Sequence, residues 1–412
     1  MDCNGARGEA VDCAMLATLM ALVSGSVCAA VQPGNGAGSG ARGEVPAAER
    51  PAPDLSATGL AKARESAIAA LLKLQEGENK DQWPYEGVYR VGGKIPFGYR
   101  VGGTAIVVEA LVTCPGYATD KARQEAVARS VKFICEGRLD PSMSEKDYDA
   151  GYDVRGWGYI HGLRTLCVLK REAAVPEGLA SAVDEAAAWY CEALQKIEIP
   201  EGGGWNYARP AGRTKAAPAS PFMTPPALEA LFLAKSLGMT VDGAIVTRAL
   251  DAIERSRGRA GSVSYSGPAR ESKSDAVPGA VGRMCATESV LLLAGRGGAD
   301  RARGAVDAFI VHWKWLDQRR AKPGTHEGPY MVAPYYFMFA HRAAAEATAM
   351  LPATERAEYQ KRINELMFSV RADDGSWNDR HFPRSAGYGT AMALLTMTMP
   401  EAKPVPKWEG GK

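Results

Sequence analysis

The sequence predicts an all-α protein in which about six helix pairs close into inner and outer rings, an α/α toroid. Three observations support this prediction. First, a sequence motif recurs in which a Gly-rich turn with an aromatic residue precedes a helix. Second, the segments between these motifs have helical periodicity. Third, no segment alternates convincingly between apolar and polar residues over the length of a strand. A repeat of this length with a helix on each side of the turn is typical of stacked helical arrays.

The recurring motif is clearest at two places in the chain. Near the C-terminus the turn reads DDGSW and ends at Trp377, with Thr390 in the helix that follows. In the middle it reads EGGGWNY, with Trp205 followed by Thr224. Each helix begins with small residues, which suits closely packed helices.

The spacing of the repeats predicts how many there are. Thr104, Thr165, Thr224 and Thr287 are separated by 61, 59 and 63 residues, and a further unit fits near Tyr336. The aromatic residues expected in the turns are Trp83, Trp157, Trp205, Tyr265, Tyr330 and Trp377. Six helix pairs over roughly 58–400 follow, and closure would remove the exposed ends of an open array. We therefore expect residues near 65 to contact residues near 390.

These turns resemble the repeats of squalene cyclases and protein prenyltransferase β subunits, over nearly the whole chain after residue 58. The resemblance implies the α/α toroid fold and a structural role for the repeat's Gln and Trp, which in that family tie neighbouring helix ends together. Gln195 precedes Trp205 here, whereas Arg371 stands before Trp377, where the family usually has Gln. We expect Trp205 and Trp377 to be buried braces.

The family's catalytic motifs are missing from this sequence. The Asp-x-Asp-Asp acid of squalene cyclases has its nearest counterpart in DYDAGYD, with Asp147, Asp149 and Asp153, which lacks the adjacent carboxylates. The Asp-x-Cys zinc ligands of prenyltransferases and the Gly-Cys-Gly-Glu-Gln thioester motif do not occur. His326 and His341 match no metal-ligand spacing, so no metal and no cofactor are predicted.

The two ends of the chain differ in composition from the repeats. Residues 1–30 contain an apolar run of about ten residues and a possible cleavage site after Ala29, which predicts a signal peptide and export to the periplasm or beyond. Residues 31–57 are rich in Gly, Ala and Pro, which predicts a flexible linker. We expect residues 58–400 to form the toroid and residues 401–412 to be a disordered tail.

Two alternatives to simple export stay open. The stretch before the apolar run is acidic rather than basic, so a misplaced start codon would leave a cytoplasmic protein. Lipid attachment at Cys28 would hold the protein close to a membrane. The cysteines after residue 100 are odd in number and lie in apolar contexts, which predicts buried free thiols.

Charge excludes one class of partner. The net charge is +2 and the basic residues are scattered, so no nucleic-acid-binding surface is predicted.

Polar residues at one offset from the repeat threonines predict a ligand site. Arg100, His161 and Arg283 each stand four residues before such a threonine, and Asp153 and Arg155 lie at a helix entry. Equivalent offsets in a ring share one rim, where helix N-termini would also favour an anionic group. The predicted aromatic wall comprises Tyr99, Tyr159, Tyr207 and Tyr335. The alternative is that each arginine braces a neighbouring turn.

Two function classes follow from these residues. The first is an exported toroid that binds a small-molecule, isoprenoid or glycan ligand in its central cavity without catalysis. The second is a terpenoid cyclase-like or glycan-active enzyme. Glycoside cleavage would need two carboxylates facing the cavity, for which Asp153, Glu288 and Glu327 are the candidates.

Overall fold

The computed structural model describes residues 52–147, 151–209, 212, 214–272, 275–320, 322, 326, 328–332 and 334–410. The expected signal peptide and most of the expected linker lie outside these ranges, as do Asp149 and Glu327. From residue 52 onward the chain forms one compact unit.

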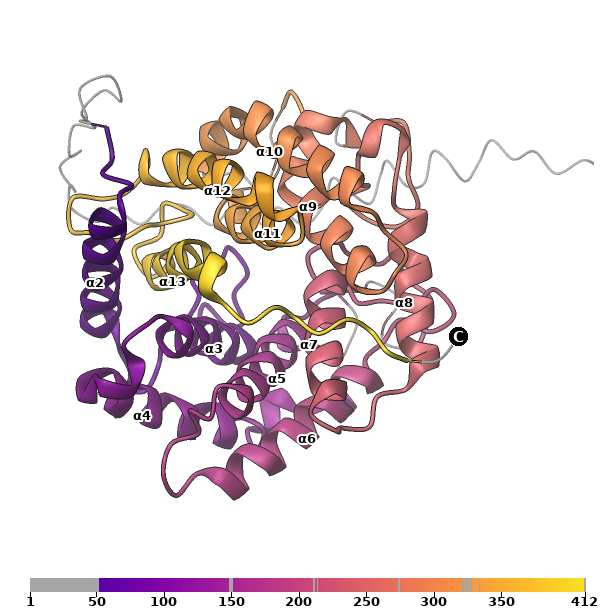
Figure 1. Cartoon of the computed structure of the whole chain (residues 1–412). Helices are drawn as coiled ribbons and strands as arrows, with labels where there is room; N and C mark the ends of the chain where they lie inside the picture. The colour runs from indigo at the N-terminus through magenta and orange to yellow at the C-terminus, as the bar shows by residue number, and fades with distance from the viewer. Residues whose placement is uncertain are drawn as a thin grey trace, which may run out of the picture. The chain divides into compact units, whose positions relative to one another are not determined.

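Twelve α-helices in the described chain alternate between an outer and an inner ring (Figure 1). The outer helices are α2 (Ala57–Leu74), α4 (Lys121–Gly137), α6 (Ala180–Lys196), α8 (Gly243–Arg255), α10 (Ala299–Arg320) and α12 (Ala353–Phe368). The inner helices are α3 (Phe97–Thr113), α5 (Arg155–Arg171), α7 (Thr224–Ser236), α9 (Val277–Leu293), α11 (Phe337–Ala349) and α13 (Ser385–Thr398). Short 3-10 turns occur at Tyr117–Thr119, Pro141–Met143, Glu145–Asp147, Arg259–Gly261, Pro334–Tyr336 and Met399–Glu401.

The ring is closed. Each inner helix contacts the next, and α13 packs against both α3 and α2. At the seam, Arg64 Nη2 donates to the Met397 carbonyl at 2.8 Å. The predicted fold class, six helix pairs and the contact between the two ends are therefore confirmed.

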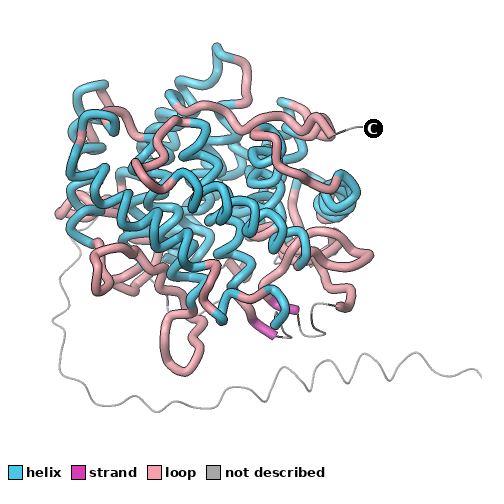
Figure 2. The backbone as a smooth tube through the Cα atoms, turned by 90° about the horizontal axis from the view of Figure 1, so that it is seen from below, coloured by secondary structure: helices cyan, strands magenta, loops and turns pink. Residues whose placement is uncertain are grey.

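A single two-residue ladder is the only named sheet in the described chain. Strand β1 (Gly151–Tyr152) pairs antiparallel with β2 (Ala208–Arg209), with Gly151 opposite Arg209. The two strands lie among the loops at one end of the ring (Figure 2).

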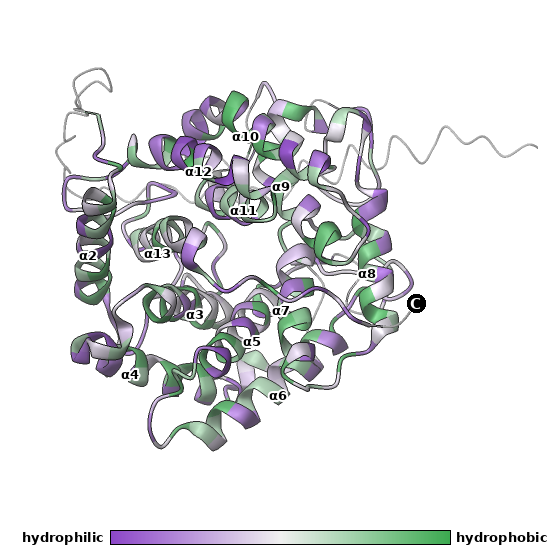
Figure 3. Ribbon diagram, viewed as in Figure 1, coloured by the Kyte–Doolittle hydropathy of each residue, from purple (hydrophilic) through white to green (hydrophobic). Residues whose placement is uncertain are grey.

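Burial distinguishes the two rings. Inner helices are buried nearly all round, as in α3 from Val101 to Val112, whereas outer helices such as α8 bury one face. Green apolar residues accordingly dominate the inner helices in Figure 3. Close packing depends on small residues: a Cβ on Gly98 would lie 2.4 Å from the Val154 carbonyl oxygen, so α3 and α5 could not approach as they do.

Buried tryptophans brace three of the six repeats in one geometry. The indole Nε1 of Trp83, Trp205 and Trp377 donates to a carbonyl near the end of the preceding outer helix, at 2.7, 2.8 and 2.9 Å. The backbone N–H of each donates to the repeat threonine of the following inner helix. Trp205 and Trp377 are 1% and 0% exposed, so the predicted structural role is confirmed.

The C-terminal segment is ordered, contrary to the expected disordered tail. It crosses the C-terminal ends of the inner helices in extended conformation (Figure 1). The Trp408 N–H donates to the Leu293 carbonyl at 3.0 Å, and its ring stacks on Phe232 with centroids 5.3 Å apart. Arg171 donates to the Pro404 carbonyl at 3.1 Å. The sequence prediction failed because a lone Trp among Pro and Lys residues gives no periodic signal.

Two smaller predictions concern cysteines and membranes. The five cysteines of the described chain are buried free thiols, as expected. None of the helices in the described ranges combines the length and apolar character needed to cross a bilayer.

Candidate functional site: an aromatic cavity at the N-terminal ends of the inner helices

A cavity of about 310 Å³ opens where the inner helices begin. Eleven of its seventeen lining residues are aromatic, and none is Asp or Glu. The lining residues are Tyr85, Gly87, Val88, Tyr89, Tyr99, Tyr152, Val154, Trp157, Tyr207, Phe222, Met223, Tyr265, His326, Tyr335, Phe339, Arg380 and Tyr388. We call this space the aromatic cavity.

One wall of the aromatic cavity is formed across the seam of the ring. Tyr85, from the loop before α3, packs on Tyr388 of α13 with ring centroids 4.7 Å apart. Trp157 of α5 lies 5.5 Å from Tyr85 and meets Tyr99 edge-on at 5.4 Å. These packed rings present flat apolar faces to the cavity.

On the opposite wall three phenol groups share hydrogen bonds. The hydroxyls of Tyr207, Tyr265 and Tyr335 lie 2.8, 3.0 and 2.5 Å apart in pairs. Burial is the main cause that raises the pKa of each phenol. All three therefore remain neutral hydrogen-bonding groups at physiological pH.

Aromatic rings continue from the cavity to the surface. Tyr207 stacks on Tyr152 with centroids 6.0 Å apart, and Tyr152 lies 6.0 Å from Tyr89. Tyr152 is 60% exposed. The β1–β2 ladder holds Tyr152 beside Tyr207, because Tyr152 pairs with Ala208, the residue next to Tyr207.

Two adjacent charged residues lie in the loop before α13, Arg380 in the cavity lining and Asp379 behind it, close to Tyr85 and Tyr388. Asp379 is fully buried, and neither of its carboxyl oxygens accepts a hydrogen bond from another described residue. Burial raises the pKa of Asp379 to about 7, against the opposing effect of Arg380. Arg380 is 4% exposed and lines the cavity, and its Nε and Nη2 have no hydrogen-bond partner in the described chain.

The repeat accounts for the position of Asp379. Tyr85 and Tyr207 each follow a brace tryptophan by two residues, and both line the cavity. Asp379 follows Trp377 by the same offset. This Trp-x-Tyr or Trp-x-Asp pattern is the signal that sequence reasoning missed.

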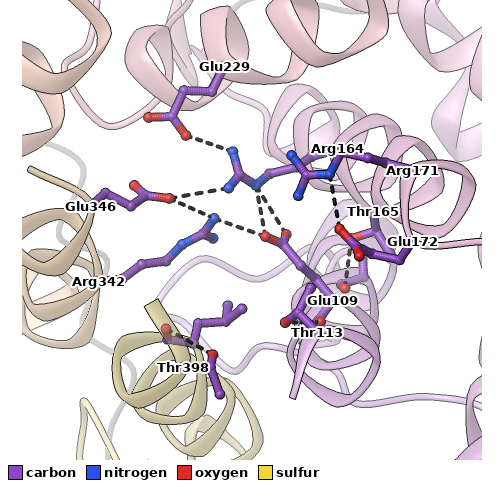
Figure 4. A network of polar contacts seen from close by, with 12 residues as sticks. Glu109, Thr113, Arg164, Thr165, Arg171, Glu172, Glu229, Arg342, Glu346 and Thr398 are labelled. Carbon is purple, nitrogen blue, oxygen red and sulfur yellow. Dashed lines mark hydrogen bonds and ion pairs between the residues drawn. The ribbon is translucent and has the colours of Figure 1, made fainter. Parts of the chain in front are cut away.

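Beneath the cavity, a buried charge cluster joins four inner helices (Figure 4). Arg164 donates to Glu109 at 3.0 Å, to Glu229 at 2.7 Å and to Glu346 at 3.2 Å. Arg342 bonds both Glu109 and Glu346 at 3.1 Å. We call these five residues the central cluster. Apart from Arg342 Nε, which has no hydrogen-bond partner in the described chain, its members bind one another, which indicates a structural role in joining the helices.

Protonation in the central cluster is uneven. Burial alone would raise the pKa of Glu109, but Arg164 and Arg342 outweigh it and hold the pKa at about 2. Burial and then Glu346 raise the pKa of Glu229 to about 7. Glu229 is therefore partly protonated near neutral pH, whereas Glu109 is ionised.

Three of the four predicted wall tyrosines line the aromatic cavity, namely Tyr99, Tyr207 and Tyr335. Their contact with a ligand stays a prediction. Tyr159 does not belong to this wall, because its ring faces Trp189 and its hydroxyl donates to the Met143 carbonyl at 2.5 Å. It points outward toward α6, and the offset argument failed because adjacent helix residues face different directions.

The predicted rim cations are braces. Arg283 is buried and donates to the carbonyls of Val263 and Gly279 and to Asp275. Arg100 donates to Gln82 at 2.8 Å and lies over the Phe97 ring, outside the aromatic cavity. The prediction that these arginines share one rim is therefore wrong.

Of the remaining predicted site residues, Asp153 and Arg155 have structural partners, whereas His161 Nδ1 is buried without a hydrogen-bond partner in the described chain. Arg155 binds Asp153 through Nε at 2.9 Å and donates to the Ser144 carbonyl at 2.6 Å. His161 lies below Trp157, next to the central cluster, and burial lowers its pKa to about 3. Neither the ion pair nor the histidine lines the aromatic cavity.

The predicted carboxylate pair does not converge on the cavity among the described residues. Asp153 is paired with Arg155, and Glu288 is buried against Arg257 at 2.9 Å. Glu327 lies outside the described ranges. No group of three His, Cys, Asp or Glu side chains in the described chain has the geometry of a metal site.

A second concavity of about 620 Å³ lies between the 76–95 loop and α13. It is polar, and two ion pairs lie in it: Arg384 with Glu76 at 3.0 Å and Arg90 with Glu86 at 2.8 Å. We call it the polar groove. Because small-molecule sites are lined mainly by apolar and aromatic side chains with a few polar groups, the aromatic cavity is the better candidate site.

No protein-family model matches this sequence, and no curated protein sequence matches it significantly. Similar solved structures do exist. The α-1,6-mannanase GH76A of Salegentibacter sp. HEL1_6 has a TM-score of 0.55 at 11% identity, over 83% of this chain and 99% of that one. A glycoside hydrolase family 76 mannosidase of Bacteroides thetaiotaomicron has a TM-score of 0.51 at 11% identity, over 83% and 98%.

The chain has the α/α toroid fold of these glycosidases. An inactive variant of the Salegentibacter mannanase, in complex with α-1,6-mannotetrose, has a TM-score of 0.54 at 9% identity, over 83% and 98%. The toroid predicted from the repeats is thus confirmed, while the matched structures are glycoside hydrolases rather than squalene cyclases or prenyltransferases.

Proposed function

We propose that this protein is a glycan-active enzyme that binds a saccharide in the aromatic cavity. The observation that carries the proposal is the lining itself, in which eight tyrosines outnumber two phenylalanines and one tryptophan. Flat aromatic faces stack on the apolar faces of sugar rings, and phenol hydroxyls pair with sugar hydroxyls. The toroids of similar fold include enzymes whose names describe action on α-1,6-mannan, which supports a glycan ligand.

Asp379 is the proposed proton donor for cleavage of a glycosidic bond. A general acid must carry its proton near the working pH, and a pKa of about 7 meets that condition. Its oxygens are buried, so donation requires a shift in the wall around Tyr85 and Tyr388. Asp379 would supply the acid of the two carboxyl groups that glycosidases use, and the described lining residues include no carboxylate for the second role of nucleophile or base.

The mannanase reaction itself is not proposed. The inactive mannanase variants have two consecutively numbered aspartates replaced. The consecutive aspartates of this chain, Asp373 and Asp374, are exposed in the turn before Trp377, where Gly375 lies against Ser66 of α2. They are on the outer side of the ring, away from the aromatic cavity.

Saccharide binding without turnover is the second candidate. It is favoured by one observation: no carboxylate is among the lining residues of the aromatic cavity. An isoprenoid ligand, suggested by the resemblance to squalene cyclases, is supported less well. A hydrocarbon chain would leave the tyrosine hydroxyls of the wall without partners other than one another.

A binding and turnover screen tests these alternatives. Neutral and acidic oligosaccharides are titrated into the protein with calorimetry, and release of reducing ends is followed in parallel for the wild type and Asp379→Asn. We expect binding, and turnover that the Asn variant loses at unchanged affinity. Binding with no turnover would leave the second candidate, and binding of squalene or farnesol in place of any saccharide would refute the glycan proposal.

Export is proposed together with this function. Residues 1–30 have the pattern of a signal peptide, and polysaccharides are usually encountered outside the cytoplasm. N-terminal sequencing of the protein expressed in its native host tests the proposal, since cleavage would leave a mature chain starting after Ala29.

A further inference from the structure

Arg380 is the one Lys or Arg side chain among the described lining residues of the aromatic cavity. Its backbone N–H donates to Asn378 Oδ1 at 3.1 Å, and its guanidinium carbon lies 5.3 Å from the centroid of Phe382. Nε and Nη2 are buried without a hydrogen-bond partner. No carboxylate of the described chain lies within ion-pair distance of it, in contrast to Arg155 and Arg283.

A buried guanidinium with two nitrogens that make no hydrogen bond is costly. Removing a cation from water is unfavourable unless hydrogen bonds and an opposite charge replace the lost hydration. The neighbouring Asp379 compensates only in part, because burial holds its pKa at about 7 and its oxygens make no hydrogen bond to the guanidinium. The unused N–H groups therefore mark a place where an acceptor is needed, and since they are as buried as the Asp379 oxygens, a ligand reaches them when the wall around Tyr85 and Tyr388 shifts.

From this geometry we infer that the saccharide bound in the aromatic cavity carries an anionic group, and that Arg380 is the residue that binds it. The inference rests on the proposed function and specifies its substrate class as acidic glycans. The planar guanidinium presents parallel N–H donors that match a carboxylate, so uronic acids fit best. A sulfate ester would offer the same kind of acceptor.

The aromatic rings place this charge in a dry setting. Arg380 shares the lining with Tyr85, Tyr99 and Tyr388, all of which are neutral because burial raises their pKa values. A charge-assisted hydrogen bond formed among such rings is screened less by salt than one at the surface. Discrimination between acidic and neutral sugars should therefore persist at moderate ionic strength.

Matched saccharides test the inference in the wild-type protein. Trisaccharides of glucuronate, galacturonate and mannuronate are titrated alongside their carboxyl-reduced neutral counterparts, and a sulfated trisaccharide alongside its desulfated form. We expect at least one acidic member to bind about ten- to a hundredfold more tightly than its neutral partner. Equal affinity within every pair would overturn the inference and leave the proposed function intact. Binding of none of the sugars would overturn both.

Variants locate the effect. Arg380→Gln should lower affinity for the preferred acidic sugar to that of its neutral partner, without changing the affinity of the neutral sugar. Arg380→Lys should keep part of the preference for the acidic sugar, since lysine retains the positive charge but lacks the parallel N–H donors of the guanidinium. Arg100→Gln is the matched control, because this arginine faces the polar groove and should change neither affinity. Preference retained in a folded Arg380→Gln protein, with thermal stability near that of the wild type, would contradict the assignment.

Discussion

Asp379 and Tyr85 come from opposite ends of the helical body and interact across the seam of the ring. After burial, the charge of Asp379 is the next cause that raises the pKa of Tyr85. The two residues hold the same place in their repeats, two positions after Trp377 and Trp83. Where two other repeats have a phenol that lines the cavity, this repeat thus has a buried carboxyl next to the wall residues Tyr85 and Tyr388.

Stability should depend on pH through Asp379. Its pKa is about 7 in the folded protein against the ordinary pKa of 3.8 for an aspartate, so between these values the folded state holds a proton that the unfolded state has lost. The contribution of Asp379 to stability therefore falls as the pH rises from about 4 to 7. The groups that act on it are Arg380, Arg320, Tyr85 and Tyr388.

Asp379→Asn removes this dependence. Urea unfolding from pH 4 to 8 should show the variant gaining stability relative to the wild type as pH rises, by on the order of a few kcal/mol at the upper end. Glu229 titrates in the same range, but it is common to both proteins and cancels in the difference. A difference that does not vary with pH would contradict the raised pKa.

The brace tryptophans should be essential for stability. Trp377→Ala removes a fully buried ring and its hydrogen bond to the Met367 carbonyl, and should cost about 3–5 kcal/mol in denaturant unfolding. Trp157→Ala is the comparison, because this half-buried ring lines the cavity and has no such bond among the described contacts. Trp157→Ala should lower the free energy of unfolding less than Trp377→Ala does, and it should lower the affinity for the saccharide more. The reverse order would refute the division between braces and wall.

A pair of threonine variants tests the second half of the brace. Thr390→Val leaves the buried N–H of Trp377 without its acceptor and should cost about 1–3 kcal/mol. Thr287 is equally buried, but its hydroxyl has no hydrogen-bond partner in the described chain, so Thr287→Val should be neutral or stabilising. Equal losses from the two substitutions would show that the hydrogen bond contributes nothing specific.

The central cluster should tolerate no single deletion. Arg164→Met leaves Glu109, Glu229 and Glu346 without their shared partner and should cost about 3–5 kcal/mol. Arg138 pairs with the more exposed Glu185, and Arg138→Gln should cost less than about 1 kcal/mol. Calorimetric unfolding of the two variants provides the comparison, and similar melting temperatures would contradict a role for the cluster in joining the helices.

The sequence predicted the ring better than it predicted the site. Periodic threonines and tryptophans report contacts that every repeat must make, so Thr104, Trp205 and Trp377 could be found by spacing alone. The site depends on which way single side chains point. Arg283 and Tyr159 lie near the starts of inner helices, as the prediction required, but their side chains bind local partners instead. Asp379 and Arg380 lie in a loop whose path depends on the packing of α13. For the wall itself, the sequence correctly indicated Tyr99, Tyr207 and Tyr335, and the Trp-x-Tyr offset would also have indicated Tyr85.

The most direct test of the central claim is a crystal structure of the protein soaked with the trisaccharide that binds most tightly. The account predicts sugar rings in the aromatic cavity, stacked on Trp157 or Tyr207, with an anionic group on the guanidinium of Arg380. Sugar bound in the polar groove beside Arg100 and Arg384, with the aromatic cavity empty, would contradict it.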